Sequence, residues 1–338
     1  MPQKAYARAG VDIDLANRLK SRLGARLRTT HRPEVLGRVG GFGGLFRASF
    51  PGHRDPVLVA SIDGVGTKLK VAFLLDKHDT VGADLVNHCI NDILTLGAEP
   101  LFFLDYIGAG KLEPRIFGSL IKGMSKACAQ AGCALLGGET AQMPGFYPPG
   151  EYDLAGCIVG LVDRARIIDG SSIRPGDAII GLPASGLHTN GYSLARKILF
   201  DDMGLGPRDR LPGLRLPIGQ ELLRTHVCYL PAIRRLMRRI PVKGMAHITG
   251  GGLVDNLPRI LPDGARAIID TKSWSVPSLF KTLRDRGGLG DAEAYQVFNM
   301  GIGYVVIVDA RHAKRTMTIL RGRRIGSVER GPTGVALV

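Results

Sequence analysis

The segment VASIDGVGTKLKVA, residues 59–72, brings together an acid, two glycines, a hydroxyl and an ammonium. Glycine lets backbone N–H groups approach an anion, a lysine neutralises phosphate charge, and a carboxylate can hold Mg²⁺, which prefers oxygen ligands. The spacing is not the GxxxxGK[ST] of a Walker loop. The segment therefore predicts either a site for a metal-bound phosphate or an ordinary hairpin at a strand end. Its candidate residues are Asp63, Gly64, Gly66, Thr67 and Lys68.

Two further stretches carry acids in similar surroundings. Asp92 lies in the helix-like run ADLVNHCINDILTLGA, and Asp84 stands eight residues earlier, so both could border one cleft. Glu139 follows an apolar strand and two glycines in LLGGETA, where a carboxylate is presented to a ligand. Each acid alone is more often a cap or a solvated residue. Together with Asp63 they predict a site for Mg²⁺ and a nucleotide.

Two glycine-rich turns are candidate ligand-binding segments. LGRVGGFGGLF (36–46), which contains Gly43, predicts either a flap over a nucleotide or a tight loop packed by its phenylalanines. HITGGGLVDNLPRIL (247–261) runs from a strand through a turn into a helix, and free N–H groups at a helix N-terminus bind phosphate. This second turn predicts a site for a substrate phosphate, with the candidate residues Thr249, Gly250, Gly251 and Gly252.

The segment ASGLHTNGYSLARKIL (184–199) has the same strand, loop and helix layout, and His188 and Asn190 are expected on its exposed turn. A histidine can donate or accept a proton near neutral pH. An ordinary capping turn explains the pattern equally well. His188 is therefore a candidate general acid or base, and an ordinary capping turn remains the alternative.

Alternating strands and helices must position these residues. Apolar runs bounded by Gly and Pro predict strands, and apolar residues at helical spacing predict helices. The interleaved order predicts a mixed α/β (α+β) fold. The predicted strands are 57–63, 101–107, 134–138, 154–162, 178–183, 265–270 and 303–308, and the predicted helices are 83–96, 114–131, 191–200, 219–240, 253–261 and 276–286.

The chain of 338 residues suits two domains. The turn-rich stretch 167–177 places the boundary near Asp169, with domains 1–169 and 170–338. The first domain holds 20 basic and 17 acidic residues, and the second holds 25 and 13. Arginines in RRLMRRI (234–240) could bind nucleic acid or cover a solvated helix, but no RNA-binding aromatic pattern or zinc-finger spacing accompanies them. We therefore expect no nucleic acid, and the basic half could attract a small phosphorylated substrate.

The cysteines and the lengths of the apolar runs indicate where in the cell the protein is located. The five cysteines lack the two pairs of a zinc site, and we expect them to be structural. Every uncharged apolar run is far shorter than the roughly 20 residues of a membrane span. The N-terminus lacks an apolar signal core. These features predict a cytoplasmic protein without membrane contact.

Motifs along nearly the whole chain resemble, in the right order, those of the phosphoribosylformylglycinamidine cyclo-ligase family. One departure is Gln142, which stands where that family has an acid. No single glycine motif would be specific, but the ordered set is. The matching segments are YARAGVDIDLANRL (6–19), RPEVLGRVGGFGGLF (32–46), DGVGTKLK (63–70), NDILTLGAEPLFFLDYIGAGKL (91–112), GGETAQMPGFY (137–147), YDLAGCIVGLVD (152–163), HTNGYSLARKIL (188–199), MAHITGGGLVDNLPRILP (245–262) and FNMGIG (298–303).

The resemblance implies an enzyme that converts formylglycinamidine ribonucleotide and ATP to aminoimidazole ribonucleotide, ADP and phosphate. It implies that Mg²⁺ is held by Asp63, Asp92 and Glu139 and that Thr67 and Lys68 hold phosphoryl oxygens. His188 would move a proton or polarise an oxygen during ring closure. The Gly43 loop and Asn190 would contact bound ligands, and the turn from Thr249 to Gly252 would anchor the ribonucleotide phosphate.

The resemblance also implies an architecture. Strands of the N-terminal domain would combine with those of a second subunit into a β-barrel at a homodimer interface, with ATP close by. The C-terminal domain would be an α/β sandwich. Thiamine-monophosphate kinase, selenophosphate synthetase and a hydrogenase maturation protein share the acid and glycine layout, but this chain lacks the N-terminal or C-terminal cysteine that the latter two need. A binding or scaffold protein without turnover would be expected to lack Asp63, Asp92 and Glu139.

Overall fold

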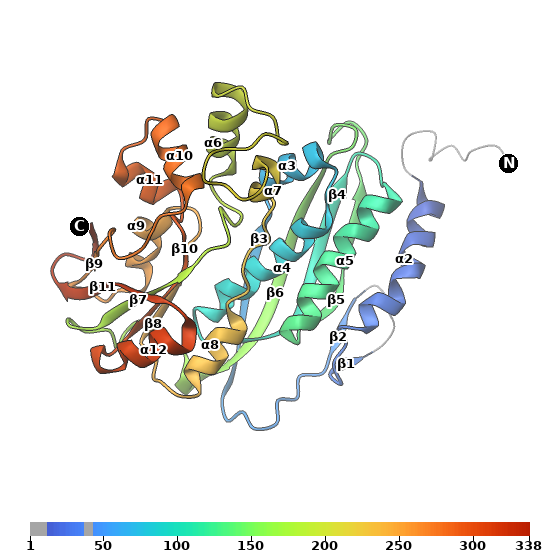
Figure 1. Cartoon of the computed structure of the whole chain (residues 1–338). Helices are drawn as coiled ribbons and strands as arrows, with labels where there is room; N and C mark the ends of the chain where they lie inside the picture. The colour runs from blue at the N-terminus through green and yellow to red at the C-terminus, as the bar shows by residue number, and fades with distance from the viewer. Residues whose placement is uncertain (1–11, 37–42) are drawn as a thin grey trace. The chain divides into compact units, whose positions relative to one another are not determined.

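The computed structural model describes residues 12–36 and 43–338 (Figure 1). The resembling segments 6–19 and 32–46 therefore lie partly outside the described residues, and Gly40 and Gly41 are among the residues left out. The chain forms two compact units. Unit 1 contains the described residues up to Ile93 together with Glu99–Ala165, and unit 2 contains Leu94–Ala98 and Arg166–Val338.

The core of unit 1 is a four-stranded sheet with the order β3, β6, β4, β5. β6 is antiparallel to both of its neighbours, whereas β4 and β5 are parallel. Parallel neighbours need a crossover, and α5 supplies it between β4 and β5. A short hairpin of β1 and β2 precedes the sheet. The bounds are β1 Val35–Leu36, β2 Leu45–Phe46, β3 Pro56–Gly64, β4 Glu99–Ala109, β5 Ala134–Gln142 and β6 Tyr152–Asp163.

Helices α4 (Asp79–Leu94) and α5 (Pro114–Ala131) run along one face of this sheet (Figure 1). Proline in the first turn of α5 suits a position that has no intrahelical donor to lose, and Gly132 ends the helix in a left-handed conformation. α2 (Ile13–Arg28) packs against α5 and β5, and α3 (Lys68–Leu75) follows directly after β3. The loop that ends β3 is thus held between two structured elements.

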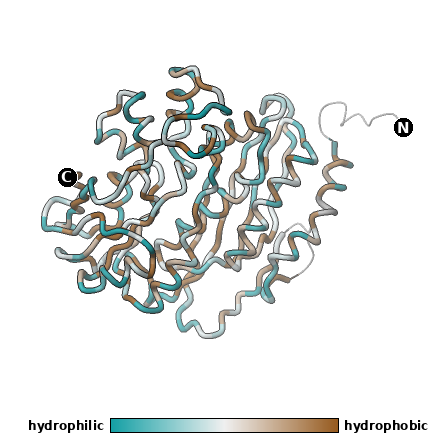
Figure 2. The backbone as a smooth tube through the Cα atoms, viewed as in Figure 1, coloured by the Kyte–Doolittle hydropathy of each residue, from teal (hydrophilic) through white to brown (hydrophobic). Residues whose placement is uncertain are grey.

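The two faces of the sheet of unit 1 differ in burial. Side chains alternate along a strand, and Phe103 and Ile158 point into the helix-covered core. The other face carries Leu58 and Ile62 on β3, whose residues are 61% and 73% exposed. In Figure 2 the backbone tube is brown, the colour of hydrophobic residues, along stretches of the strands in this sheet. An apolar sheet face therefore remains uncovered in a single copy of the chain.

Unit 2 contains a six-stranded sheet with the order β12, β9, β11, β7, β10, β8. All neighbouring pairs are antiparallel except β12 and β9. β10 is buried along its whole length, as is almost all of β7, which explains their continuous apolar sequences. The bounds are β7 Ala178–Pro183, β8 Gly244–His247, β9 Ala265–Ile269, β10 Ile302–Val308, β11 Arg323–Arg330 and β12 Gly334–Leu337.

Short helical segments surround this sheet, and two pairs pack together, α8 with α12 and α9 with α11. None of the described helices is both long and apolar enough to cross a membrane. The helical segments from Arg164 onward are η1 Arg164–Arg166, α6 Tyr192–Arg196, η2 Lys197–Asp202, α7 Ile218–Leu222, α8 Leu230–Met237, α9 Gly252–Asn256, η3 Pro258–Ile260, α10 Ser278–Arg286, α11 Asp291–Val297, η4 Ala310–His312 and α12 Ala313–Leu320.

The mixed fold class and all seven predicted strands are confirmed. The single helix predicted over 219–240 is wrong, because α7 ends at Leu222 and α8 begins at Leu230. Pro231 in the first turn of α8 explains the new start, since proline cannot continue a helix from the preceding turn. The sequence pattern predicts a loop or hairpin after the strand at Asp63, but Lys68 is instead the first residue of α3.

Candidate functional site

Unit 1 brings Asp63 and Asp92 to the same histidine. Asp63 is the penultimate residue of β3, and His88 and Asp92 lie one turn apart on α4. His88 Nε2 is 2.6 Å from Asp63 Oδ2 and 3.7 Å from Asp92 Oδ2. Ser61 Oγ donates a hydrogen bond of 3.2 Å to Asp92. Two predicted metal ligands therefore converge, although the sequence reasoning did not include the histidine between them.

The electrostatics of this cluster favour charged groups. Burial opposes the charged form of Asp63, but the hydrogen bond and charge of His88 and the N–H of Gly64 outweigh it, so the pKa of Asp63 lies below its ordinary value. Burial also opposes the charge of His88, yet Asp63, Asp92 and Asp84 raise its pKa. The cluster is thus built to hold positive charge between carboxylates.

This donor chemistry fits Mg²⁺, a hard cation that takes one or two carboxylates and keeps other positions for water and phosphate. The side chains of Asp63 and Asp92 are 41% and 28% exposed, so both are accessible to an ion. His88 is only 3% exposed and stands behind them. The two aspartates are therefore the groups of this cluster that could hold an ion.

Glu139, the third predicted ligand, is not brought to this cluster within one chain. In the strand register, Asp63 pairs with Gly156, which pairs with Asp105 on β4, whereas Glu139 pairs with Tyr106. Three strand spacings of roughly 4.8 Å separate β5 from β3. Because neighbouring positions along a strand point to opposite faces, Glu139 also points to the face away from Asp63.

Lys68 occupies a different place from the one that a phosphate ligand would take. Its Nζ lies 2.7 Å from Asp84 Oδ2, and both side chains are 0% exposed. Burial lowers the pKa of Lys68, and the charge of Asp84 opposes that shift. Gly66 and Thr67, just before it, are exposed at the start of α3. The surface of this turn therefore consists of Gly66 and Thr67, with Lys68 beneath it.

In unit 2 the glycine turn and Asn190 lie side by side. A Cβ added to Gly250 would lie 3.4 Å from Asn190 Oδ1. Gly252 has a φ of +56°, and a Cβ there would stand 1.9 Å from the carbonyl oxygen of Tyr295, so only glycine fits. Two residues predicted separately, Asn190 and Gly250, are thus neighbours.

Asn256, which the sequence reasoning passed over, fixes this turn. Its Nδ2 donates to the carbonyl oxygens of Gly250 and Gly252 at 3.1 and 2.8 Å, and Thr249 Oγ1 donates to its Oδ1 at 3.3 Å. The side chain is 3% exposed. The helix after the turn, α9, has only five residues. The turn is therefore shaped by this amide more than by a long helix.

His188 is buried, which corrects the prediction of an exposed turn. The residue is 1% exposed and has a left-handed φ of +62°, which is uncommon outside glycine. Its Nε2 accepts a hydrogen bond of 3.2 Å from the backbone N–H of Ser185. In the neutral ring the hydrogen therefore sits on Nδ1. Gly43, by contrast, is exposed two residues before β2.

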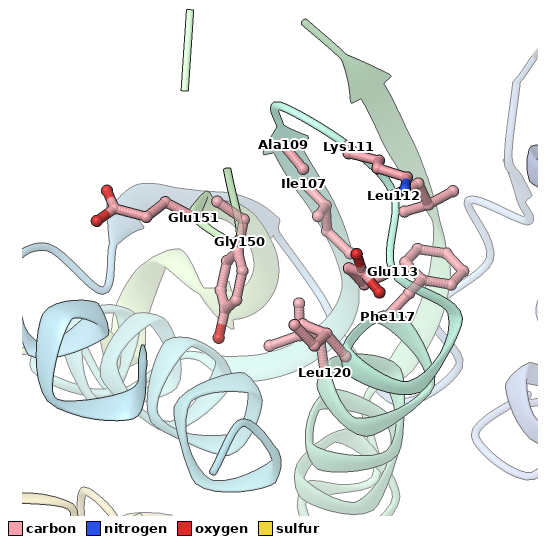
Figure 3. Close-up of a pocket in the computed structure, with 11 residues that line it drawn as sticks. Ile107, Ala109, Lys111, Leu112, Glu113, Phe117, Leu120, Gly150 and Glu151 are labelled. Atoms are coloured by element: carbon pink, nitrogen blue, oxygen red, sulfur yellow. The ribbon is translucent and has the colours of Figure 1, made fainter. Parts of the chain in front are cut away.

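A separate, shallow pocket lies at the end of β4 in unit 1 (Figure 3). Phe117 and Leu120 of α5 face Ile107, while the carboxylate of Glu151 points away from them (Figure 3). None of the predicted site residues lines the pocket, so it takes no part in the acid cluster.

The fold defines a class of two-unit α/β proteins that solved structures share. A structure titled hydrogenase maturation protein HypE in complex with ATP matches with a TM-score of 0.67 at 20% identity, covering 95% of this chain and 90% of that one. Thiamine-monophosphate kinase from Stenotrophomonas maltophilia matches with a TM-score of 0.65 at 17% identity, covering 97% and 96%. These likenesses establish the shared fold.

Sequence comparisons identify the family within this class. Residues 48–162 match the model of the AIR synthase related protein N-terminal domain, and residues 174–337 match that of the C-terminal domain. The chain belongs to the AIR synthase related protein family. Relatives named phosphoribosylformylglycinamidine cyclo-ligase include those of Citrifermentans bemidjiense, 52% identical over 94% of this chain and 91% of the relative, and Geobacter sulfurreducens, 50% identical over 98% and 97%.

Proposed function

We propose that the chain is a ligase of purine biosynthesis that closes the imidazole ring of aminoimidazole ribonucleotide at the expense of ATP. The observation that carries this function is the 50–52% identity to named cyclo-ligases over nearly the full length of the chain. The chain retains Asp63, Asp92 and Glu139, which a non-catalytic relative would be free to lose.

Ring closure expels the formyl oxygen, and as hydroxide or water this oxygen is a poor leaving group. Transfer of the ATP γ-phosphoryl group to it gives a good leaving group. The amidine-derived nitrogen then attacks the formyl carbon, a C–N bond forms, the C–O bond breaks and phosphate departs, while the nitrogen loses a proton. ATP is thereby consumed once for each ring closed.

Unit 1 supplies the groups suited to the phosphoryl transfer. Mg²⁺ bound by Asp63 and Asp92 would neutralise charge on the transferred phosphoryl group. The exposed turn of Gly66 and Thr67 offers backbone and hydroxyl groups at the start of α3, where an anion is stabilised. Lys68 supports this turn from below through Asp84.

Unit 2 supplies the groups suited to the ribonucleotide. Thr249 and the three glycines after it form a turn that Asn256 holds in shape, and Asn190 lies beside it. We assign the substrate phosphate to this turn. His188, with its hydrogen on Nδ1, would donate to an oxygen during ring closure.

Two copies of the chain would complete the protein. The apolar sheet face around Leu58 and Ile62 needs a partner, because monomers rarely expose continuous apolar surface of this kind. A second copy of the same sheet would cover it and close the strands into a barrel. In such a dimer Glu139 could reach a metal only across the interface, since its own chain separates it from Asp63. The cytoplasmic location stays a prediction, which cell fractionation would test.

The test is turnover of purified protein with formylglycinamidine ribonucleotide, ATP and Mg²⁺. The proposal expects aminoimidazole ribonucleotide and ADP to form together, and neither to form without Mg²⁺. Thiamine monophosphate serves as the competing substrate because a relative of the same fold bears that kinase name. Phosphorylation of thiamine monophosphate without ring closure would overturn the assignment.

A further inference from the structure

Three buried histidines from separate segments of unit 2 meet in one cluster. His188 follows β7, His226 lies between α7 and α8, and His247 is the last residue of β8. They are 1%, 1% and 4% exposed, and one ring nitrogen of each lies within 4.8 Å of the others. The proposed function uses only His188, so the other two rings need an explanation.

His226 and His247 are joined through their ring nitrogens. The two Nε2 atoms lie 2.9 Å apart, a normal hydrogen-bond distance. A neutral imidazole has one donor and one acceptor nitrogen, so one ring donates this hydrogen and the other accepts it. If both rings were protonated, two N–H groups would face each other. The pair therefore shares one hydrogen between its two Nε2 atoms.

His188 stacks on this pair. Its ring centroid is 3.9 Å from that of His226, and the two planes are inclined by 19°. The lone pairs of imidazole nitrogens lie in the ring planes, so those of two nearly parallel rings do not converge on one ion at the roughly 2.0–2.1 Å of a zinc–nitrogen bond. The stack is therefore arranged for ring contact rather than for a shared metal.

The surroundings fix the ring of His188 in this position. Ser185 N–H donates to its Nε2 at 3.2 Å, and a Cβ added to Gly303 of β10 would stand 2.4 Å from its Cε1. Two phenol rings of unit 2 lie near the cluster: the ring of Tyr229 is 6.2 Å from that of His188, and the ring of Tyr304 is 6.1 Å from that of His247.

We propose that His226 and His247 form a proton-sharing pair that positions His188 for ring closure. The stack with His226 and the hydrogen bond from the Ser185 N–H hold the His188 ring in one orientation, with its Nε2 as the acceptor. His188 thus stays neutral, with its hydrogen on Nδ1 as a donor. His226 acts through His188 and is a positioning residue. This inference rests on the proposed function in assigning His188 to the ring-closing step.

The test compares His226→Gln, His247→Gln and the double variant with the parent chain. We expect each single variant to lower kcat roughly 10-fold or more, because a small misplacement of a reacting group is costly. The KM for ATP should stay within about twofold, and the double variant should be no slower than the slower single variant, as residues acting as a unit are non-additive. His312→Gln, a partly exposed histidine of the same unit, is the matched control.

A second readout does not depend on turnover. Nitrogen-15 NMR of labelled histidines should show neutral His188 protonated on Nδ1 at pH 7 and a single hydrogen shared by the two Nε2 atoms. Folded His226→Gln protein should lose the shared hydrogen signal. Unchanged kcat in that variant, or a charged His188 in the parent chain, would overturn the proposal. So would one Zn²⁺ bound per chain and lost in His226→Gln. If the parent chain makes no product while NMR shows the pair, the proposed function fails and the pair stands.

Discussion

Lys68 Nζ and Asp84 Oδ2 form an ion pair of 2.7 Å in which both side chains are completely buried. The pair ties the first residue of α3 to α4, beneath the turn of Gly66 and Thr67. The sequence pattern had assigned Lys68 to a phosphate. In the structure its ammonium instead neutralises a carboxylate inside unit 1, which makes it a support of the candidate site.

Lys68→Met should therefore destabilise the protein strongly. Removal of one partner leaves a buried, uncompensated charge on Asp84, which typically costs about 3–5 kcal/mol in free energy of unfolding. Urea unfolding measures the loss. The control is Lys70→Met. The side chain of Lys70 is 42% exposed in its ion pair with Glu151, so the loss of this pair should cost less than about 1 kcal/mol. A Lys68→Met protein of normal stability but with a raised KM for ATP would restore the phosphate role.

The buried Asp105 should make stability depend on pH. Burial is the main cause that raises its pKa to about 7, and the charge of Glu139 adds to it. The unfolded carboxyl titrates near 3.9, so between about pH 4 and 7 the folded chain holds a proton that the unfolded chain has released. Its contribution to the free energy of unfolding then falls as pH rises, by up to about 1.4 kcal/mol per unit.

Urea unfolding of Asp105→Asn and of the parent chain at pH 5 and pH 7 would isolate this contribution. The variant lacks the titrating group, so its stability should fall less between the two pH values. Asp153→Asn, which removes an exposed carboxylate of β6, should keep the slope of the parent chain. Equal slopes for all three proteins would show that Asp105 is ionised in the folded state throughout this range.

Ile62→Glu should dissociate the proposed dimer. This residue is 73% exposed on the uncovered face of β3, and burying a carboxylate there would be costly. Sedimentation velocity should give a dimer for the parent chain and a monomer for the variant. Leu74→Glu, at an apolar α3 residue that is 56% exposed, should leave the dimer intact. A parent chain that sediments as a monomer would show that a second copy of the chain does not cover this face.

Asn256→Ala should weaken ribonucleotide binding selectively. The variant loses two hydrogen bonds to carbonyl oxygens of the turn, at Gly250 and Gly252. Bonds of this kind contribute roughly 0.5–1.5 kcal/mol each, so the KM for the ribonucleotide should rise about 10-fold or more. Initial-rate kinetics would show little change in the KM for ATP. Gln296→Ala, an exposed neighbour that bonds to Asp255, is the control, and a similar rise there would count against the role of Asn256.

The sequence predicted elements best where one local signal dominates. β7 and α5 were predicted with the bounds that they have, because an apolar run defines the strand and a proline and a glycine define the helix ends. The helix over 219–240 failed because apolar spacing continued through the break before α8. α3 was missed because its glycine-rich start resembles a loop.

The residues of the candidate site also divide into those that a local sequence signal predicts and those that depend on the tertiary fold. Asp63 and Asp92 were found by residue type, and His88 could have been found too, because Asp84, His88 and Asp92 recur every four residues on one helix face. No local signal could have joined His226 to His247, since their contact depends on how a loop and a strand fold together. The separation of Glu139 from Asp63 likewise follows from strand order alone.

The most direct test of the ring-closing function is to follow the formyl oxygen. Formylglycinamidine ribonucleotide labelled with oxygen-18 in the formyl group would be incubated with ATP and Mg²⁺, beside an Asp63→Ala control. We expect one labelled oxygen in each phosphate released, equal amounts of ADP and aminoimidazole ribonucleotide, and loss of all three products in the control. Label appearing in water, or ADP formed without the closed ring, would contradict this expectation.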